Sequence, residues 1–442
     1  MKTILIIGAG RSASSLISYL LEEGKKNNWN VRIGDLDEKL AQQKIAGHSN
    51  GSAFRFDISD PDQREQEISN ADITVSMLPA FMHGSVAKDC VRLGKHLVTA
   101  SYISEEMRAL NDEAKKKNII LLNEIGLDPG IDHMSAMEII TRLKNEGAEI
   151  ISFHSYCGGL VAPESNDNPW GYKFSWNPRN VILAGQGTAL YIENGEEKEL
   201  PYSRLFAEAK TVNVEGSGEY DAYANRDSLS YRAVYGLEKI PTMLRGTLRM
   251  KGFCKAWNVF VQLGLTDESK KIKGSEGMTY SELMNSIIPG SGDLKERLAN
   301  FMQVKMDDEI ISKVEWTGIL SNEKITLKDA SLAQILQELL ERKWKLRESD
   351  KDLIVMQHEF IYIKNGAKKK IFSSLVVKGE DQVHTAMAKT VGLPAAIAVK
   401  NILLGKIKTT GVCAPVVPEI YVPVLNELHS FGINFAEREE LV

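Results

Sequence analysis

The chain has 442 residues, enough for roughly three domains of about 150 residues each, and its 43% hydrophobic and 26% charged content is typical of a globular protein. A net charge of -5 gives no reason to expect nucleic acid or an anionic membrane as a partner, which favours a small-molecule ligand. The four cysteines form no C-x-x-C pair, so they indicate neither a disulfide framework nor a metal site, and a reducing cytoplasm suits them best.

A strand, a glycine-rich turn and a helix are predicted at the N-terminus. The apolar run Thr3–Ile7 meets a G-x-G turn, and apolar residues then recur at helical spacing. In a Rossmann unit Gly8 would allow the tight turn and Gly10 would let the backbone approach a pyrophosphate, while Ala13 takes the third, helix-packing position. The alternative is a glycine turn in a sheet that binds nothing.

The next segments alternate between strands and helices, which predicts a parallel sheet covered on both faces. At the end of the second strand, Asp35 could accept hydrogen bonds from a ribose 2′-OH, and taken alone it favours NAD over NADP. Arg11 is the nearby cation that could answer a 2′-phosphate. The predicted strands are Asn30–Ile33, Phe54–Ile58, Asp72–Leu78, His96–Thr99 and Ile119–Leu122, and the helices between them include Met82–Leu93 and Glu105–Lys117.

Polar residues follow two of these strands, where ligands of parallel sheets gather. Ser101 and Tyr102 follow one strand, and Asp128 follows the next at a Gly/Pro-rich joint. Asp128 has two interpretations: a polar group in a cleft between domains, or a cap of the helix that begins near Pro129. His133, near the start of that helix, is predicted to be structural.

The sequence pattern changes after residue 149. A strand at Ser152–Tyr156 leads into loops rich in Gly, Pro and aromatic residues, which are typical of ordered loops lining a site. Farther on, Arg226 and Arg245 stand beside Gly and Asn, where a guanidinium could grip both oxygens of a carboxylate. Surface ion pairs are the alternative for each arginine.

The rest of the chain is predicted to be a helical segment, a hairpin and two helices. His358 and Glu359 lie one strand step apart and face opposite sides, so they are not a metal pair. The predicted elements are a type I′ hairpin of Ala189–Glu193 with Lys198–Pro201, helices within Tyr280–Lys345, a second hairpin of Leu353–Ile363 with Lys369–Val377, a small-residue-rich helix at Val383–Leu404 and a last helix at Val422–Phe431.

Several strings of unusual composition run through the chain: ILIIGAGRSA, VTASYIS, NEIGLDPGIDHMSAM, SYCGGLVAPESNDNPWGYKFSWNPR, NRDSL, LRGTLR, VMQHEF and TAMAKTVGLPAAIAVKNILLGKI. Through them the chain resembles, nearly end to end, the saccharopine reductases, the glutamate-forming saccharopine dehydrogenases of lysine metabolism. The resemblance implies condensation of 2-aminoadipate 6-semialdehyde with glutamate, followed by hydride reduction of the imine to saccharopine. It also implies a homodimer.

The resemblance further implies an α/β fold with an N-terminal Rossmann domain, a second α+β substrate domain and a small helical domain. The first domain is expected to comprise residues 1-127 and 385-442, because the C-terminal segment of the family returns to complete it. The second is expected at 128-270 and 350-384, and the helical domain at 271-349.

The site residues that the resemblance implies fall into three groups. Asp128 and Tyr102, with Cys157 as a weaker third, are candidates for binding the amine or moving protons. The expected cofactor residues are Gly8, Ala9, Gly10, Arg11, Ser12 and Ala13 at the phosphates, Asp35, Leu36 and Asp37 at the ribose, Asp57 and Ile58 near the adenine, and Leu78, Ala100, Ser101, Leu127, Asp128, Pro129 and Ser175 at the nicotinamide half. The expected substrate residues are Ser101, Tyr102, Asp128, Arg226, Arg245, Gly246 and Thr247.

Cofactor choice and function each keep an alternative. The resemblance favours NADP, but NADP-using members carry an arginine where this chain has Leu36, and Asp35 favours NAD. A related imine reductase, of the carboxynorspermidine or homospermidine synthase type, shares the glycine fingerprint. A nucleotide-binding regulator without turnover is the alternative from another class, since a fold alone does not establish catalysis.

Overall fold

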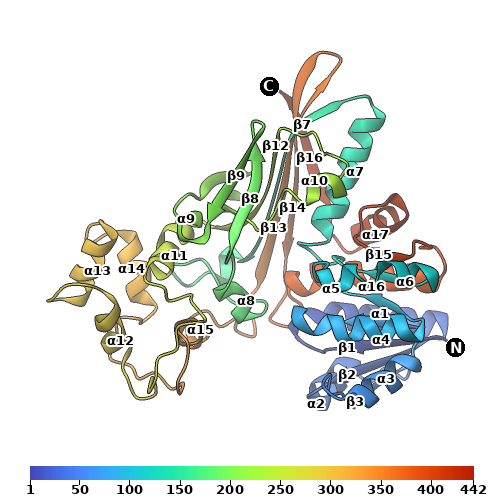
Figure 1. Ribbon diagram of the computed structural model, residues 1–442, viewed down its shortest axis with the longest axis horizontal. Coiled ribbons are helices and arrows are strands. Elements are labelled where there is room, and N and C mark those ends of the chain that lie inside the picture. Colours follow the sequence, from blue (N-terminus) through green and yellow to red (C-terminus); the bar gives the residue numbers. More distant parts are fainter. The chain divides into compact units, whose positions relative to one another are not determined.

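The computed structural model describes residues 1–442, and the chain forms two compact units (Figure 1). The first comprises Met1–Glu149 and Val377–Phe435, and the second comprises Ile150–Val376 and Ala436–Val442. The predicted helical domain, residues 271–349, thus falls within the second unit, and the last seven residues belong to the second unit although they were assigned to the first domain. The three-domain division itself stays a prediction.

The first unit is built on a seven-stranded sheet in which each strand pairs with its neighbours in parallel. The order β15-β6-β5-β4-β1-β2-β3 is that of a doubly wound fold with one added strand, so the prediction of a Rossmann domain is confirmed. The strands are β1 (Thr3–Ile7), β2 (Asn30–Asp35), β3 (Gly51–Arg55), β4 (Ile73–Ser76), β5 (His96–Val98), β6 (Ile120–Leu122) and β15 (Gly411–Cys413).

Short helices connect these strands, and their caps follow from the sequence. Asp37 and Asp60 accept backbone N–H groups at the starts of α2 and α3, where a carboxylate satisfies donors that the helix leaves unpaired. The helices of the first unit are α1 (Ser14–Asn27), α2 (Glu38–Ile45), α3 (Pro61–Ser69), α4 (His83–Leu93), α5 (Glu105–Arg108), α6 (Asn111–Lys116), α7 (Ile131–Asn145), α16 (Ala386–Leu403) and α17 (Pro418–Ser430), with the 3-10 turns η1 (Arg11–Ala13) and η2 (Ala80–Met82).

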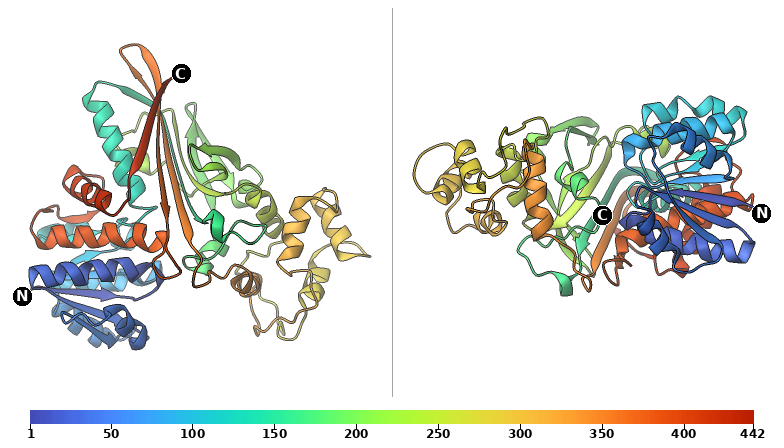
Figure 2. Two further views of the ribbon diagram at one scale, coloured as in Figure 1. Left: turned by 180° about the vertical axis from the view of Figure 1, so that it is seen from behind. Right: turned by 90° about the horizontal axis from the view of Figure 1, so that it is seen from below.

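Helix α16 packs along α1, at the glycine turn (Figures 1 and 2). A Cβ at Gly392 would lie 2.9 Å from the Leu16 amide nitrogen and 3.2 Å from the Ser12 carbonyl oxygen, so the small residue permits the close approach. By length and composition α16 could cross a membrane, but 83% of it is buried within the protein, as is typical of a core helix. Helix α16, from the C-terminal part of the chain, is therefore part of the core of the first unit.

The second unit is built on a nine-stranded sheet in the order β10-β11-β12-β7-β13-β14-β16, with β8 and β9 added at β12. Asn194 and Gly195 both have positive φ, 53° and 83°, which confirms the predicted type I′ turn between β8 and β9. The strands are β7 (Glu149–Val161), β8 (Thr188–Glu193), β9 (Glu196–Pro201), β10 (Lys210–Val214), β11 (Gly218–Ala224), β12 (Thr242–Met250), β13 (Asp352–Lys364), β14 (Ala367–Lys378) and β16 (Phe435–Leu441).

An aromatic core joins the helical segment to this sheet. Trp170 stacks on Phe260 with ring centroids 5.5 Å apart, and Trp344 meets Trp170 edge-on at 5.4 Å. Helix α11 contacts β11, β12 and α14, so it links the sheet with the helices that follow. The helices of the second unit are η3 (Pro163–Ser165), α8 (Pro178–Ile182), α9 (Tyr202–Leu205), α10 (Tyr231–Val234), α11 (Phe253–Gln262), α12 (Tyr280–Ile287), α13 (Leu294–Met302), α14 (Glu309–Trp316) and α15 (Leu332–Lys343).

We expect Leu336→Ala in α15 to destabilise the second unit. Leu336 is fully buried in this core, and a Leu-to-Ala change at such a site costs about 2–5 kcal/mol of unfolding free energy. Urea denaturation followed by tryptophan fluorescence measures the change. Glu341→Ala, on the exposed face of the same helix, is the matched control and should stay within about 0.5 kcal/mol of the parent. Equal effects of the two changes would contradict this assignment of the core.

Candidate functional site

The turn after β1 fits a dinucleotide pyrophosphate. Gly8 has φ +101°, and a Cβ there would lie 3.1 Å from the Met77 carbonyl oxygen, so this position requires glycine. Gly10 is exposed, and a Cβ there would meet nothing within 4 Å, so the open space beside its backbone can take a ligand. Residues Arg11–Ala13 form the 3-10 turn η1, which continues into α1, with Arg11 exposed, Ser12 half-buried and Ala13 buried.

The carboxylate of Asp35 is used by the turn itself. Its Oδ2 accepts a hydrogen bond from the Ala9 N–H at 2.7 Å, and its Oδ1 accepts one from the Asp37 N–H at 2.9 Å. Each oxygen thus already has a backbone donor, which accounts for an acid at this position without a ribose. Asp35 therefore has a role in the turn that does not depend on which cofactor binds.

The other residues predicted near the adenosine are engaged locally. Asp37 caps α2, and Asp57 accepts hydrogen bonds from the Ser59 hydroxyl and from the Ser59 N–H at 3.0 Å, which hold the pKa of the Asp57 carboxyl below its usual range. Ile58 is half-buried and its carbonyl accepts a hydrogen bond from Arg64. Leu36 is 63% exposed and lines a shallow hollow of about 650 Å³ with Asp37, Glu38, Lys39 and Gln42.

The residues of the first unit that are predicted at the nicotinamide half lie after the carboxyl ends of β4, β5 and β6. A Cβ at Gly126 would lie only 2.9 Å from the Ala100 side chain, so the segments after β5 and β6 touch there. The Glu124 N–H also donates to the Ser101 carbonyl at 3.0 Å. Leu78, Ala100 and Ser101 are half-buried, and Leu127 and Pro129 are buried.

Tyr102 and Asp128 are brought together, 26 residues apart in sequence. The Tyr102 hydroxyl donates to Asp128 Oδ1 at 3.3 Å, and both side chains are partly buried. The interpretation of Asp128 as a helix cap is wrong. Helix α7 begins at Ile131 after Gly130, whose N–H donates to Asp132 Oδ1 at 2.6 Å, so Asp132 serves the helix start and Asp128 is left facing Tyr102.

A buried carboxylate that the sequence analysis did not single out, Glu124, fixes both of these segments. Its Oε1 accepts the Ile103 N–H at 2.9 Å, next to Tyr102, and its Oε2 lies 2.9 Å from His133 Nε2 on α7. Glu124 is 3% exposed, His133 is fully buried, and Glu124 has a φ of +56°. The prediction that His133 is structural agrees with this geometry. The left-handed residue leaves no sequence pattern, because it is neither Gly nor Asn.

Two of the substrate residues predicted in the second unit, Arg245 and Thr247, share one face of its sheet. Arg245 on β12 is 2% exposed, and its guanidinium lies 4.4 Å from the Tyr231 ring centroid. The Asn225 N–H donates to the Arg245 carbonyl at 2.8 Å, which brings exposed Arg226 beside it. Thr247 pairs with Cys157 of the parallel neighbour β7, and Cys157 is buried. The buried Arg245 is therefore not a surface ion-pair residue.

Two further predicted residues lie in the second unit: Gly246 of the substrate set, and Ser175, which was predicted at the nicotinamide half. A Cβ at Gly246 would lie 2.7 Å from the Tyr156 ring, so glycine lets the two strands pack at this point. Ser175 is buried in the segment before α8.

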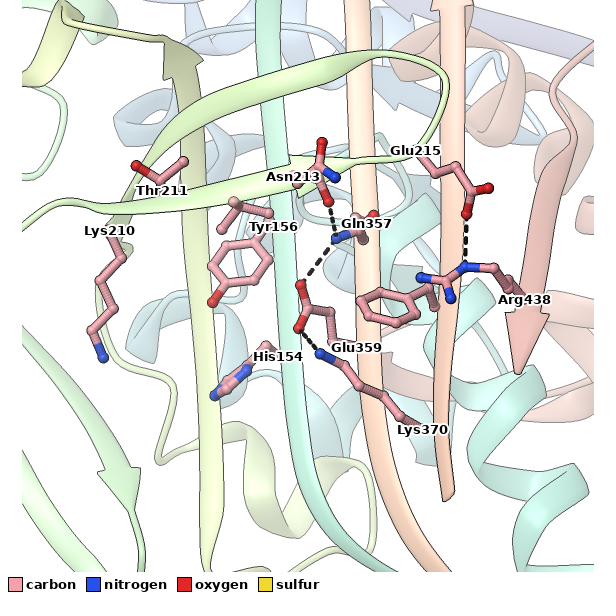
Figure 3. Close-up of a pocket in the computed structure, with 12 residues that line it drawn as sticks. His154, Tyr156, Lys210, Thr211, Asn213, Glu215, Gln357, Glu359, Lys370 and Arg438 are labelled. Atoms are coloured by element: carbon pink, nitrogen blue, oxygen red, sulfur yellow. Dashed lines mark hydrogen bonds and ion pairs between the residues drawn. The ribbon is translucent and has the colours of Figure 1, made fainter. Parts of the chain in front are cut away.

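The opposite face of the same sheet holds a cavity of about 700 Å³ (Figure 3). Tyr156 and His154 line it from β7, and because side chains alternate along a strand, Cys157 faces the other side. The charged lining is paired, with Lys370 on Glu359 at 2.9 Å, and Glu359 and His358 face opposite sides as predicted. The cavity therefore lies on the face of this sheet opposite to Arg245 and Thr247.

Comparison with known proteins covers nearly the whole chain. The family profile described as "Saccharopine dehydrogenase NADP binding domain" matches residues 4–122, and the profile "Saccharopine dehydrogenase C-terminal domain" matches residues 126–433. A protein of Pyricularia oryzae named "Saccharopine dehydrogenase [NADP(+), L-glutamate-forming]" is 34% identical over 449 residues, 99% of each chain.

Two further relatives, one curated sequence and one solved structure, also match nearly the whole chain. An "Alpha-aminoadipic semialdehyde synthase" of Arabidopsis thaliana is 33% identical over 99% of this chain and 45% of its own length. The solved structure of the apo, histidine-tagged, L-Glu-forming saccharopine dehydrogenase of Saccharomyces cerevisiae superposes with a TM-score of 0.89 over 100% of both chains, at 32% identity.

The Glu124 network yields a stability prediction. Glu124→Ala leaves the buried His133 ring and the Ile103 N–H without this partner, and breaking a buried pair from one side costs about 3–5 kcal/mol. Thermal unfolding measures the loss. The control Glu113→Ala removes a surface carboxylate paired with Lys117 at 3.3 Å, and such pairs contribute about 0–1 kcal/mol. A Glu124→Ala protein as stable as this control would show that the network does not hold the segment.

Proposed function

Because the chain belongs to the saccharopine dehydrogenase family, we propose that it interconverts saccharopine and 2-aminoadipate 6-semialdehyde plus L-glutamate, with NADP as cofactor. The observation that carries the proposal is 34% identity over 99% of the chain to an NADP+-dependent, L-glutamate-forming enzyme. The glycine turn between β1 and α1, with open space beside Gly10, supports the dinucleotide. In the forward direction the aldehyde and the amine lose water to form an imine, and bound NADPH supplies the hydride that reduces it.

Two residues of the first unit are proposed to act on the nitrogen of the substrate. An ionised Asp128 beside a protonated amine stabilises its charge, which orients the substrate without proton transfer. The Tyr102 hydroxyl, 3.3 Å from Asp128, can hold that carboxylate in place or carry a proton when water is lost. Cys157 is the weaker third candidate. Its thiol is buried on the face of the sheet that carries Arg245.

The carboxylates of saccharopine are assigned to the second unit. Arg226 and Arg245 supply guanidinium groups, each able to bind both oxygens of a carboxylate. Gly246 and Thr247 supply backbone and hydroxyl donors beside them, and Ser101 is the proposed polar contact from the first unit.

NADP is proposed over NAD for two reasons. The relatives that match over nearly their full length carry NADP(+) in their names. In addition, the backbone hydrogen bonds that Asp35 accepts from Ala9 and Asp37 give this acid a role in the turn that does not depend on NAD. Arg11, exposed at the turn, is the proposed partner of the 2′-phosphate.

We further propose that the protein is a homodimer and resides in the cytoplasm. Four free cysteines suit a reducing compartment. Sedimentation equilibrium tests the dimer, and fluorescence microscopy of a tagged chain in its own cells tests the compartment.

The alternatives are a related imine reductase and a regulator without turnover. The full-length relatives favour the saccharopine reaction over both. Absorbance at the band of the reduced nicotinamide, after addition of saccharopine with NADP or NAD in separate cuvettes, decides among them. We expect reduction with saccharopine and faster reduction with NADP. No reduction with either cofactor would contradict the proposed function.

Substitution of Asp128 tests its role. A charged hydrogen bond contributes about 1.5–3 kcal/mol, so Asp128→Ala should lower kcat/KM for saccharopine by about 10- to 100-fold. Asp128→Asn separates the two roles: an anchor of the amine chiefly raises KM, whereas a proton carrier lowers kcat and removes one limb of the pH profile. Unchanged kcat/KM in the alanine variant would remove Asp128 from the site.

Asp35→Ala tests whether the Asp35 carboxylate holds the glycine turn or faces the ribose of the cofactor. Because both Asp35 oxygens hold backbone N–H groups, we expect the dissociation constants of NADPH and NADH, measured by fluorescence, to rise together by about 10-fold. If the carboxylate instead faced the ribose, the variant would bind NADH more weakly and NADPH more tightly. That opposite pair of shifts would overturn our assignment.

A further inference from the structure

One buried imidazole is surrounded by hydroxyls from two strand ends at the carboxyl edge of the first sheet. His83, the first residue of α4, lies with Nδ1 2.8 Å from Ser76 Oγ, at the end of β4. Its Nε2 lies 2.7 Å from Ser101 Oγ and 3.4 Å from Thr99 Oγ1, both just after β5. Both ring nitrogens of His83 are therefore occupied by serine hydroxyls.

The imidazole is neutral at physiological pH. Burial lowers the pKa of His83 to about 4, and no charged neighbour contributes to the shift. A neutral imidazole carries a proton on one nitrogen and a lone pair on the other. It therefore donates to one serine and accepts from the other, so the hydroxyl direction of Ser101 is coupled to that of Ser76.

The backbone of Ser101 is held independently of His83. Its carbonyl accepts the Glu124 N–H at 3.0 Å, and its own N–H donates to Thr99 Oγ1 at 3.3 Å. Loss of the imidazole would consequently leave this backbone in place but free the hydroxyls of Ser76 and Ser101, and the Ser101 side chain could then turn among its three staggered rotamers.

We propose that His83 is a positioning residue that fixes the Ser101 hydroxyl toward the nicotinamide and substrate. The inference rests on the proposed function, since Ser101 is one of the residues assigned to both ligands there. His83 does not touch the ligands; it sets the rotamer of a group that does. Supporting residues of this kind typically change affinity or activity by about 10- to 100-fold.

Two conservative variants separate positioning from packing. The amide nitrogen of asparagine can occupy the place of Nδ1, and that of glutamine the place of Nε2. His83→Gln therefore keeps the contact with Ser101, whereas His83→Asn keeps only the contact with Ser76. A residue that merely fills the core would give no reason for glutamine to rescue and asparagine to fail.

The test measures kcat/KM for saccharopine with NADP and the dissociation constant of NADPH by fluorescence. We expect His83→Asn to lower kcat/KM by about 10- to 100-fold and His83→Gln to stay within about fivefold of the parent. In a Ser101→Ala background, His83→Asn should have no further effect, because the group that it positions is gone. Ser85→Ala, which removes a hydroxyl bonded to the Met82 carbonyl at 3.0 Å on the same helix, is the control and should leave activity unchanged.

Equal losses in the two His83 variants, or an undiminished effect of His83→Asn in the Ser101→Ala background, would overturn the proposal and leave His83 a packing residue. The proposed function fails separately, if the parent protein does not reduce NADP with saccharopine. In that case the NADPH dissociation constants still decide the role of His83: weaker binding in His83→Asn than in His83→Gln supports it, and equal binding contradicts it.

Discussion

The buried carboxylate of Glu124 is the contact on which the candidate site depends. One oxygen holds the backbone after Tyr102 and the other holds His133 on α7, so the ends of β5 and β6 are tied to the same group. An ionisable group this deeply buried is costly unless it is fully hydrogen-bonded, and two strong partners meet that requirement. As a consequence Tyr102 and Asp128 face each other from segments that are 26 residues apart in sequence.

Two neighbouring residues also hold groups of the candidate site through hydrogen bonds. Asp35 holds the glycine turn through backbone N–H groups, and His83 holds the hydroxyl of Ser101. In each case a polar residue beside the predicted site orients a group that is expected to meet a ligand, and its own hydrogen bonds are satisfied within the protein. Asp35 and Glu124 therefore hold the backbone of the candidate site, whereas Asp128 is proposed to contact the substrate.

The sequence predicted much of the fold because local patterns carried it. The βα alternation from Thr3 to Leu122 gave the parallel sheet, and Asn-Gly pairs gave both hairpins. Strand β16 was missed because its sequence, FAEREEL, holds four consecutive charged residues in place of an alternation of apolar and polar ones, and its pairing with β14 is set by tertiary structure. Strand β15 was missed because it begins with glycine and lacks the apolar run that marks the equally short β5 and β6.

The residues of the candidate site were predicted less completely than the fold. Motif residues such as Gly8 and Asp128 are marked by sequence, but the residues that hold them are not, since the role of Glu124 depends on a left-handed φ and that of His83 on two distant serines. The role of Asp35 in the turn has the same origin, because sequence places the acid but does not show which way its oxygens turn.

A crystal structure of the protein with NADPH and saccharopine tests the central claim most directly. The account predicts the pyrophosphate at the Gly8–Ala13 turn and the secondary amine within about 3 Å of an Asp128 carboxylate oxygen. Saccharopine bound instead in the cavity lined by His154 and Tyr156, with Asp128 away from any ligand atom, would contradict it.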